Sequence, residues 1–339
     1  MPNSIKHDLA HACAASTNLS RRMVLGMGAG MAFAPGLALA DDYPSRPIRL
    51  MVGATPGGSI DIAARVIATA LTGLLGTPVI VENKPGASGV INSDYVAKAA
   101  PDGYTLMVGT PGPVIIAPQA MAKVAFNPLT DLTAINMVST SPIAFAVNPK
   151  LSVHKLSDLV ALAKQRPVSM GLPLAGSLSH LVVEMAAKAG GCSFTNIPYK
   201  GAAPAINDVI AGHVDATVSD LGVFLPFHRE NRLRIIMTSS EKRLAILPEV
   251  LTANEEYPGL SVTNWIGVFG PAKMPSALSN KINAALQKMV TLPDVRAQFA
   301  RSAVTSVSLP DTRAFQGFVA SEYLRYGRLL RERNISISE

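Results

Sequence analysis

Hydrophobic residues follow two alternating patterns along most of this chain. Short apolar runs, such as residues 47–53 and 104–108, are typical of buried strands. Between these runs, apolar residues recur with helical spacing, as in the series that begins with Ile60, Ala63 and Ile67. That spacing places them on one face of a helix. The alternation predicts repeated strand–helix–strand units, and therefore an α/β protein whose sheets are mostly parallel and flanked by helices.

The same two patterns locate the individual elements. The predicted strands cover residues 47–53, 78–81, 104–108, 168–171, 194–198, 216–219 and 234–237. The predicted helices cover residues 60–74, 92–99, 155–165, 179–189, 203–211, 277–289, 295–302 and 311–331. Gly76 is expected to end the first of these helices, because glycine favours the position after a helix.

The pattern also predicts two lobes joined by two crossings of the chain. Residues 134–148 contain two extended pieces around Ser139-Thr140-Ser141-Pro142, and residues 261–269 form another extended segment that returns. We therefore expect residues 41–141 and 265–339 in lobe 1, and residues 142–264 in lobe 2. Two chain crossings are typical of a hinge on which lobes close around a ligand.

The first 40 residues have the layout of a bacterial export signal. Ser20-Arg21-Arg22-Met23-Val24-Leu25 is a twin-arginine pattern, and an apolar stretch leads to the small-residue cleavage site Ala38-Leu39-Ala40. The apolar stretch is short and glycine-rich for a membrane anchor. The sequence predicts a signal peptide over residues 1–40, cleaved after Ala40, and a periplasmic location. Twin-arginine export and general secretion both remain open.

Charge and cysteine content narrow the class of protein. The chain has a formal net charge of +7, but its basic residues are dispersed and no aromatic residues interleave with them. We therefore expect no nucleic-acid partner. Cys13 lies in the predicted signal, which leaves Cys192 as the single cysteine of the mature chain and excludes an internal disulfide. The mature chain is long enough to build its own core, and we expect a monomer.

Four short loops of small residues carry the strongest functional signal. They are Thr55-Pro56-Gly57-Gly58-Ser59, Gly109-Thr110-Pro111-Gly112, Ala175-Gly176-Ser177-Leu178-Ser179 and Tyr199-Lys200-Gly201-Ala202. Each follows a predicted strand, and in open α/β sheets ligands bind at the carboxyl ends of strands. Glycine lets the backbone approach a ligand, and the helix that follows offers free N–H groups and a positive dipole end. These loops favour a site for a small anion.

The predicted ligand-binding residues come from these loops and from one later strand end. They are Gly57, Gly58, Ser59, Thr110, Gly112, Gly176, Ser177, Ser179, Tyr199, Gly201, Ala202 and Asp220. The hydroxyl groups among them could instead bond only within their own turns. Asp220 could accept a bond from a ligand hydroxyl or amine, or cap a helix. Asp61 is expected to hold its loop, and Trp265 to lie in the core. Whether Lys200 or His180 contacts the ligand stays open.

Motifs for catalysis are missing. The predicted mature chain contains no metal-spaced histidine pair, no Gly-x-Ser-x-Gly elbow and no phosphate-binding loop. Ser152-Val153-His154-Lys155 matches a serine–x–x–lysine pattern, but the companion lysine–threonine–glycine motif is not present. We therefore expect no catalytic residues, no metal and no cofactor.

A series of short motifs resembles one known family. They are Tyr43-Pro44-Ser45-Arg46-Pro47-Ile48, Pro56-Gly57-Gly58 with Asp61, Val81-Glu82-Asn83-Lys84-Pro85-Gly86-Ala87, Ala99-Ala100-Pro101-Asp102-Gly103-Tyr104-Thr105-Leu106, Pro198-Tyr199-Lys200-Gly201, Gly212-His213-Val214-Asp215 and Trp265-Ile266-Gly267-Val268-Phe269. In this order they resemble the Bug (Bordetella uptake gene) family, the extracytoplasmic solute receptors of tripartite tricarboxylate transporters.

The resemblance implies a two-lobed, type II-like periplasmic-binding-protein fold with the ligand in a cleft that closes. It implies a small carboxylate ligand, held largely by backbone N–H groups, hydroxyls and bridging waters, and a partnership with the membrane components of the transporter. Two other functions remain open from the residues: a periplasmic enzyme acting on a small carboxylate, and a ligand-sensing partner of a membrane kinase.

Several loops depart from the family pattern. Ala54-Thr55 replaces an aromatic or proline residue, Pro111 offers no N–H, Leu174-Ala175 precedes Gly176 where a glycine is usual, and Asp220-Leu221 replaces Asp-Asn. These changes make the predicted site more apolar. They affect the expected identity of the ligand more than the expected role as a receptor.

Overall fold

The computed structural model describes residues 43–121, 124–173, 176–199 and 201–333. The predicted signal peptide, its cleavage site after Ala40 and Lys200 lie outside the described residues. Within the described part of the chain, no helix combines the length and the hydrophobicity that crossing a membrane requires.

The first group of elements surrounds a three-stranded parallel sheet. Strand β1 (Ile48–Val52) lies between β2 (Val79–Asn83) and β3 (Thr105–Gly109), as the alternating pattern predicts. Helix α1 (Ser59–Leu75) follows β1, buries its apolar face and ends at Gly76 in the left-handed conformation. The fully buried Ile67 and Leu71 on this face are each expected to stabilise the fold by roughly 1.5–3 kcal/mol. We call this group the first lobe.

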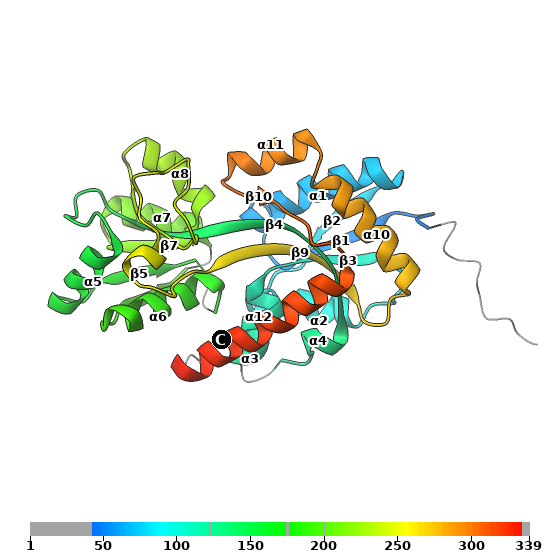
Figure 1. Ribbon diagram of the computed structural model, residues 1–339, viewed down its shortest axis with the longest axis horizontal. Helices are drawn as coiled ribbons and strands as arrows, with labels where there is room; N and C mark the ends of the chain where they lie inside the picture. The colour runs from blue at the N-terminus through cyan, green and yellow to red at the C-terminus, as the bar shows by residue number, and fades with distance from the viewer. Residues whose placement is uncertain (1–42, 122–123, 174–175, 200, 334–339) are drawn as a thin grey trace, which may run out of the picture. The chain divides into compact units, whose positions relative to one another are not determined.

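Several other helices complete the first lobe. They are η1 (Ala87–Gly89), α2 (Val90–Ala97), η2 (Gly112–Ile116), α3 (Ala117–Ala120), α4 (Pro128–Asp131), α10 (Ser276–Met289) and α11 (Pro293–Arg301). Helices α10 and α11 come from the C-terminal part of the chain and pack against α1. The first lobe is therefore built from two distant segments of the sequence (Figure 1).

Two long strands connect the first lobe to the rest of the protein. Strands β4 (Leu132–Val147) and β9 (Thr263–Pro271) run antiparallel, from the pair Leu132–Pro271 to the pair Pro142–Thr263. Beyond Pro142, β4 pairs instead with β7 (Ala216–Asp220) and β8 (Arg234–Thr238). Because these crossing strands pair antiparallel with their neighbours, the sheets contain both parallel and antiparallel pairs. Strand β9 lies between β3 and β4.

One expectation about the crossing was wrong. Residues 134–148 were predicted as two extended pieces around Pro142, but β4 is one strand of 16 residues. Pro142 lies where the pairing partner of β4 changes, so its missing N–H costs less than it would inside one ladder. The register also shifts twice within the β4–β9 pair, which lets the strand bend without ending.

The second lobe repeats the strand–helix scheme. Strand β5 (Ser169–Leu172) pairs in parallel with β6 (Thr195–Pro198) and with β7. Its helices are α5 (Leu156–Gln165), α6 (Leu178–Gly190), α7 (Ala202–Ala211), α8 (Leu221–Arg229) and α9 (Ala253–Glu256). The helical pattern that begins at Asp220 in the sequence forms α8, although its bounds were not predicted and Pro226 lies within it.

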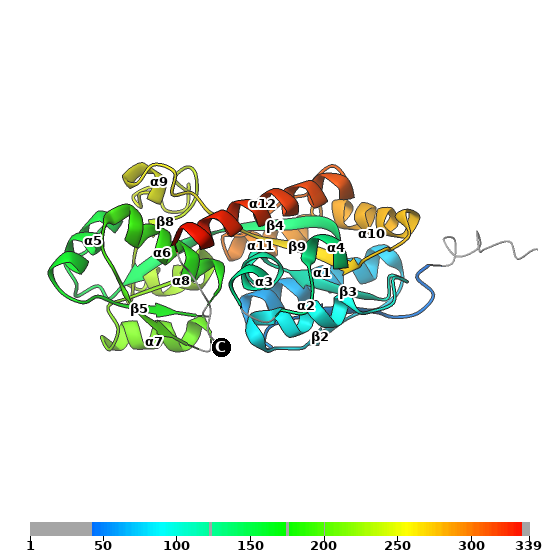
Figure 2. The same cartoon turned by 90° about the horizontal axis from the view of Figure 1, so that it is seen from below.

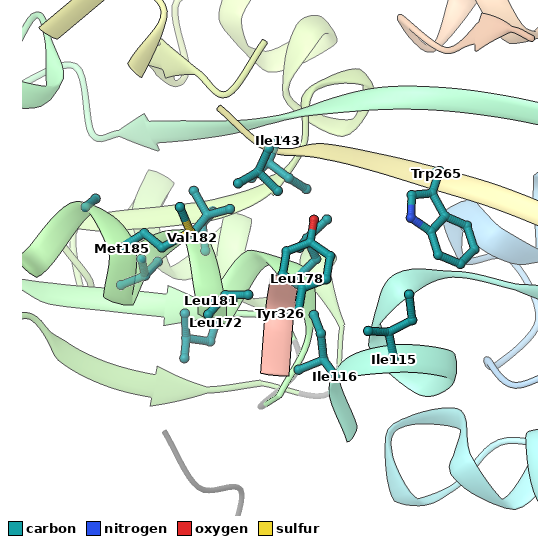
Figure 3. Close-up of a cluster of buried hydrophobic side chains, with 14 of the residues drawn as sticks. Ile115, Ile116, Ile143, Leu172, Leu178, Leu181, Val182, Met185, Trp265 and Tyr326 are labelled. Atoms are coloured by element: carbon teal, nitrogen blue, oxygen red, sulfur yellow. The ribbon is translucent and has the colours of Figure 1, made fainter. Parts of the chain in front are cut away.

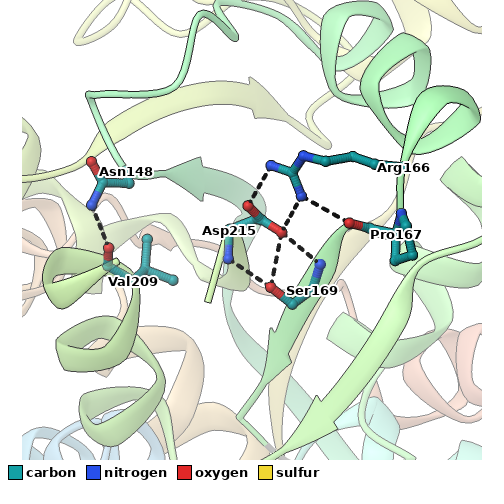
Figure 4. A network of polar contacts seen from close by, with 6 residues as sticks. All are labelled: Asn148, Arg166, Pro167, Ser169, Val209 and Asp215. Atoms are coloured by element: carbon teal, nitrogen blue, oxygen red, sulfur yellow. Dashed lines mark hydrogen bonds and ion pairs between the residues drawn. The ribbon is translucent and has the colours of Figure 1, made fainter. Parts of the chain in front are cut away.

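A polar network fixes the start of the second lobe's sheet (Figure 4). Asp215 accepts two hydrogen bonds from the Arg166 guanidinium, at 2.7 and 3.0 Å, and two from the backbone and hydroxyl of Ser169. Nearby, the Asn148 amide donates to the carbonyl of Val209. These contacts join β5 to β7 and the end of β4 to α7. They lie at the opposite ends of β5 and β7 from the loops predicted to bind ligand.

The long helix α12 (Thr312–Arg333) packs along β4, η2 and α3 (Figure 2). The short strand β10 (Thr305–Ser306), which precedes it in the chain, pairs with β4. Tyr326 of α12 belongs to one apolar cluster with Ile116 of η2 and Leu178 of α6 (Figure 3). Trp265 is in the same cluster and only 1% exposed, which confirms its predicted core position. Apolar residues of both lobes therefore share one core beside the crossing strands.

Candidate functional site

One large cavity lies where loops of both lobes meet. Its volume is about 1040 Å³, at the upper end of the range for ligand pockets in proteins. Every residue predicted from the sequence to bind ligand lines it: Gly57, Gly58, Ser59, Thr110, Gly112, Gly176, Ser177, Ser179, Tyr199, Gly201, Ala202 and Asp220. The structure brings these residues together without testing whether they touch a ligand.

Several helices begin at this cavity, and four of them start in or directly after the loops predicted to bind ligand. Helix α1 starts at Ser59, η2 at Gly112, α6 at Leu178 and α7 at Ala202. The first N–H groups of a helix have no partner within it, and together they carry a partial positive charge. The cavity therefore has a field that attracts anions from its backbone alone.

Three of the loops depend on glycine for their shape. Gly57, Gly176 and Gly201 have φ angles of +83°, +73° and +122°, a conformation that side-chain-bearing residues rarely adopt. Each of these glycines also uses its own N–H within the protein. Gly57 donates to the Asp61 carboxylate at 2.9 Å, Gly176 to Nδ1 of His180 at 3.1 Å, and Gly201 to the Pro173 carbonyl at 2.8 Å.

This arrangement corrects one detail of the predicted anion cradle. Gly57 was predicted to offer its N–H to the ligand, but Asp61 already accepts it. The free donors are instead the N–H groups in the first turn of each helix, at residues such as Ser59 and Ala202. The glycines shape the loops, and the residues that follow them line the cavity.

Asp61 holds the first loop as expected. It is 1% exposed and accepts hydrogen bonds from Gly57, Arg65 and Asn83, each at 2.9 Å. Burial opposes its charge, but these donors outweigh burial and hold the pKa of Asp61 below its ordinary value. Asp61 does not line the cavity, and its charge is neutralised by Arg65.

Ser177 and His180 organise the start of α6. Ser177 is the N-cap, and its hydroxyl oxygen accepts the N–H of His180 at 3.3 Å. Because that bond uses only the oxygen as acceptor, the hydroxyl hydrogen can still point to a ligand. His180 in turn fixes Gly176 and does not line the cavity. The structure therefore supports a loop-orienting role for this histidine.

Thr110 and Tyr199 differ in the donors they can offer. Thr110 is 6% exposed, and its hydroxyl has no hydrogen-bond partner among the residues that the structure describes. Tyr199 donates its phenolic hydrogen to Asp208 at 2.5 Å. Burial and this carboxylate raise the pKa of Tyr199 to about 12. Tyr199 is therefore neutral, and because its hydroxyl hydrogen is bonded to Asp208 it can offer a ligand only its ring and its phenolic oxygen. The Thr110 hydroxyl can donate a hydrogen bond to a ligand.

Asp220 is held by the two crossing strands. One of its oxygens, Oδ1, accepts a hydrogen bond from the Ser141 hydroxyl at 2.9 Å and another from the Asn264 amide at 2.8 Å. Ser141 and Asn264 are opposite each other in the β4–β9 pair. The second oxygen, Oδ2, has no hydrogen bond from any described residue. Burial raises the pKa of Asp220, although both donors oppose that shift.

The sequence reasoning missed much of the cavity wall. Apolar side chains there include Ile60, Val108, Ile143, Leu178, Ile206, Val223 and Phe227. A further part of the wall comes from residues 85–89, at the start of η1 and α2. The motif at residues 81–87, which overlaps this segment, is the feature of the sequence that could have identified it as part of the wall. Val223 and Phe227 were not identified because no bounds were predicted for the helical pattern that begins at Asp220.

Catalytic and metal-binding arrangements are not found in the described residues. No group of three or more His, Cys, Asp or Glu side chains there could hold a metal ion. Cys192 is half-buried, does not line the cavity, and has a pKa that burial raises. A raised pKa makes a thiol a poorer nucleophile.

Comparison with known proteins gives a consistent result. Residues 63–335 match the family TctC, described as "Tripartite tricarboxylate transporter family receptor". Protein BugT of Bordetella pertussis is 36% identical over 93% of this chain and 98% of its own length. A solved structure described as Rhodopseudomonas palustris Rpa4515 with adipate is 28% identical, has a TM-score of 0.81 and covers 87% of this chain and 99% of that one.

A second solved relative binds another carboxylate. MatC from Rhodopseudomonas palustris, described with bound malate, is 26% identical, has a TM-score of 0.78 and covers 85% of this chain and all of that one. These relatives are binding proteins, and the family is not an enzyme family. The cavity, its helix starts and the whole length of the fold agree with this assignment, so the chain belongs to the TctC family of periplasmic solute-binding receptors of tripartite tricarboxylate transporters.

Proposed function

We propose that this protein binds a small organic carboxylate in the cavity and delivers it to the membrane components of a tripartite tricarboxylate-type transporter. The observation that carries the proposal is the convergence of four helix starts and several hydroxyl groups on one cavity. Such a site can hold an anion by hydrogen bonds without a cationic side chain. Relatives described with adipate and malate support a carboxylate as the ligand.

The proposed donors come from both lobes. In the first lobe they are the Thr110 hydroxyl and the first N–H groups of α1, beginning at Ser59. In the second lobe they are the Ser177 hydroxyl and the first N–H groups of α6 and α7, including Ser179 and Ala202. A ligand that bonds to both sets favours the arrangement in which the lobes are close. Residues 41–141 with 265–339, and residues 142–264, are the proposed moving units.

The proposed location is the periplasm, after removal of residues 1–40. A twin-arginine pattern and a small-residue cleavage site support this proposal. Export in a cleaved, free form suits a receptor that carries its ligand to a membrane partner. We propose that the receptor works as a monomer.

A binding screen tests the proposed function. Periplasmic protein produced from the full chain is titrated with monocarboxylates, dicarboxylates, tricarboxylates and amino acids while its melting temperature is recorded. A ligand that binds only the folded state raises the melting temperature by mass action. Saturable binding of a carboxylate without chemical change is expected. Conversion of the bound compound would identify an enzyme instead, and binding restricted to non-acidic compounds would overturn the proposal.

A further inference from the structure

The charges around the cavity are distributed unevenly. Among the described residues that line it, none is a lysine, an arginine or a histidine, and Asp220 is the single acidic residue. Among the described residues, two arginines on or beside elements that contribute to the cavity are engaged elsewhere. Arg65 is paired with Asp61 beneath the first loop, and Arg232 lies over the ring of Phe227 and pairs with Glu230. Neither arginine lines the cavity.

Apolar side chains surround Asp220. Ile143 is its partner in the β4–β7 pair, and Val223 and Phe227 project from the same face of α8, which begins directly after it. We call Ile143, Asp220, Val223, Phe227 and Asn264 the hinge wall, since they sit on or beside the crossing strands. Apart from Asp220, the Asn264 amide and the N–H groups in the first turn of α8, this wall offers a ligand only hydrocarbon surface.

A second carboxylate would be poorly accommodated at the hinge wall. It would lose hydration beside apolar side chains, and it would meet the carboxylate of Asp220 rather than a cation. The free oxygen Oδ2 of Asp220 can accept a hydrogen bond but cannot donate one while ionised. The cavity volume of about 1040 Å³ leaves room for an apolar body beyond the carboxylate that the helix starts attract.

We propose that the ligand is a monoanionic carboxylate with an apolar body, and that Asp220 in the hinge wall discriminates against a second carboxylate. This inference rests on the proposed function, because it takes the helix starts as the site of the first carboxylate. A hydroxyl or amine at the far end of the ligand is compatible with it, since either group can donate to Oδ2. The relatives described with adipate and malate make dicarboxylates the direct competitors to test.

The test compares ligands that differ only at the far end. Hexanoate, 6-hydroxyhexanoate and adipate share one straight chain, and 4-methylbenzoate and terephthalate share one ring. Isothermal titration calorimetry of each with the periplasmic protein at neutral pH gives the dissociation constants. We expect each dicarboxylate to bind about tenfold or more weakly than its monocarboxylate counterpart, which reflects the cost of burying an unpaired charge. The hydroxy acid is expected to bind at least as tightly as hexanoate.

Variants assign the effect to Asp220. Asp220→Asn keeps an oxygen that can accept from Ser141 and Asn264 but removes the charge, so it should strengthen adipate binding about tenfold. Its hexanoate affinity is measured alongside, and the ratio of adipate to hexanoate affinity should rise about tenfold. The matched control is Asp94→Asn, which removes one negative charge from α2 at a residue that does not line the cavity. This variant should change neither the adipate affinity nor the hexanoate affinity. Melting temperatures of all variants check that each one is folded.

The outcomes separate this inference from the proposed function. Tighter binding of adipate than of hexanoate would overturn the inference and leave a carboxylate receptor. Lys200→Met tests whether Lys200, in the loop between Tyr199 and Gly201, supplies a cation to the second carboxylate of adipate. If adipate binds tightly and this variant loses that binding, the inference is overturned. Failure of every acid in both series to bind would remove the proposed function together with the inference.

Discussion

Gly112 of the first lobe and Ser177 of the second lie almost in contact beside the cavity. A Cβ atom added to Gly112 would be 3.8 Å from the Cα atom of Ser177, which is ordinary van der Waals contact. Both residues line the cavity, and they belong to different lobes. The structure therefore shows the two lobes close together at this point.

The first prediction concerns this contact. Gly112→Phe places a ring beside the backbone of Ser177 and at the cavity wall, so it should disfavour the close arrangement and weaken ligand binding by about 1–3 kcal/mol. Gly112→Ala is the matched control and should bind nearly as well as the unmodified protein. Small-angle scattering should show a smaller radius of gyration on ligand saturation for the unmodified protein and the control, but a reduced change for Gly112→Phe. Equal binding by both variants would contradict the proposed closure.

A second prediction separates the two roles of Ser177. Ser177→Ala removes both the N-cap of α6 and a proposed ligand donor, so affinity should fall by about 1–2 kcal/mol and stability by about 0.5–2 kcal/mol. Ser177→Gly retains most of the capping effect and should lose affinity with a smaller loss of stability. Calorimetric titration and urea unfolding measure the two quantities. Lys200→Ala should cost less affinity than Ser177→Ala, and the reverse order would refute this account of the donors.

The third prediction concerns Asp61 and acid. Its pKa is held below the ordinary value, so its ionised form stabilises the folded state above the unfolded-state pKa, and this stability is lost as the pH falls through the folded-state pKa. Asp61→Asn should therefore lower the free energy of unfolding by about 1–3 kcal/mol at neutral pH. The difference should disappear in strong acid. Urea unfolding across the acid range measures it, and a difference that does not depend on pH would argue for a purely steric effect.

Asp220 should behave in the opposite way. Its pKa is raised in the folded state, so the folded protein is most stable relative to the unfolded chain when this group is protonated. The stability that protonated Asp220 contributes to the fold is fully present below the ordinary aspartate pKa, and it is lost as the pH rises through the folded-state pKa. Asp220→Asn, without ligand, should melt at a higher temperature than the unmodified protein at neutral pH. The advantage should shrink toward acid, and a variant that is less stable at neutral pH would show that the charge is compensated.

The fifth prediction concerns the N-terminus. Cleavage after Ala40 would make Asp41 the first residue of the exported protein. Intact-mass measurement of periplasmic material decides this point. Replacing Arg21 and Arg22 together by lysine should block export only if the twin-arginine route is used. Retention of residues 1–40 in a membrane fraction would contradict the predicted cleavage.

Much of this fold could be predicted because its elements are strongly periodic and clearly bounded. Helix α1 shows a regular apolar face and a terminal Gly76, and the structure places both as expected. The bounds of helix α8 were not predicted because Pro226 interrupts the helical pattern that begins at Asp220, although the buried Phe224 and Leu225 hold the helix in place. The continuity of β4 was missed because Pro142 is a local signal, whereas the change of pairing partner is set by tertiary contacts.

The candidate site was predictable in position but not in detail. Small residues after strands mark where a cavity forms, since parallel strands end at one edge of a sheet. The bonds that occupy the N–H groups of Gly57, Gly176 and Gly201 depend on partners that the spacing of glycines does not reveal. The hydrogen bonds from Ser141 and Asn264 to Asp220 join residues far apart in sequence, and only the folded chain brings them together.

The position of β9 has a consequence for the newly made chain. This strand, residues Thr263–Pro271, fills the slot between β3 and β4, which are synthesised more than a hundred residues earlier. Until it emerges from the ribosome, β3 and β4 both present unpaired hydrogen-bonding edges, the feature that draws strands of different molecules together. The first lobe cannot be completed co-translationally from its own N-terminal half. A nascent chain of this protein therefore depends on protection from aggregation until nearly four-fifths of it has been made.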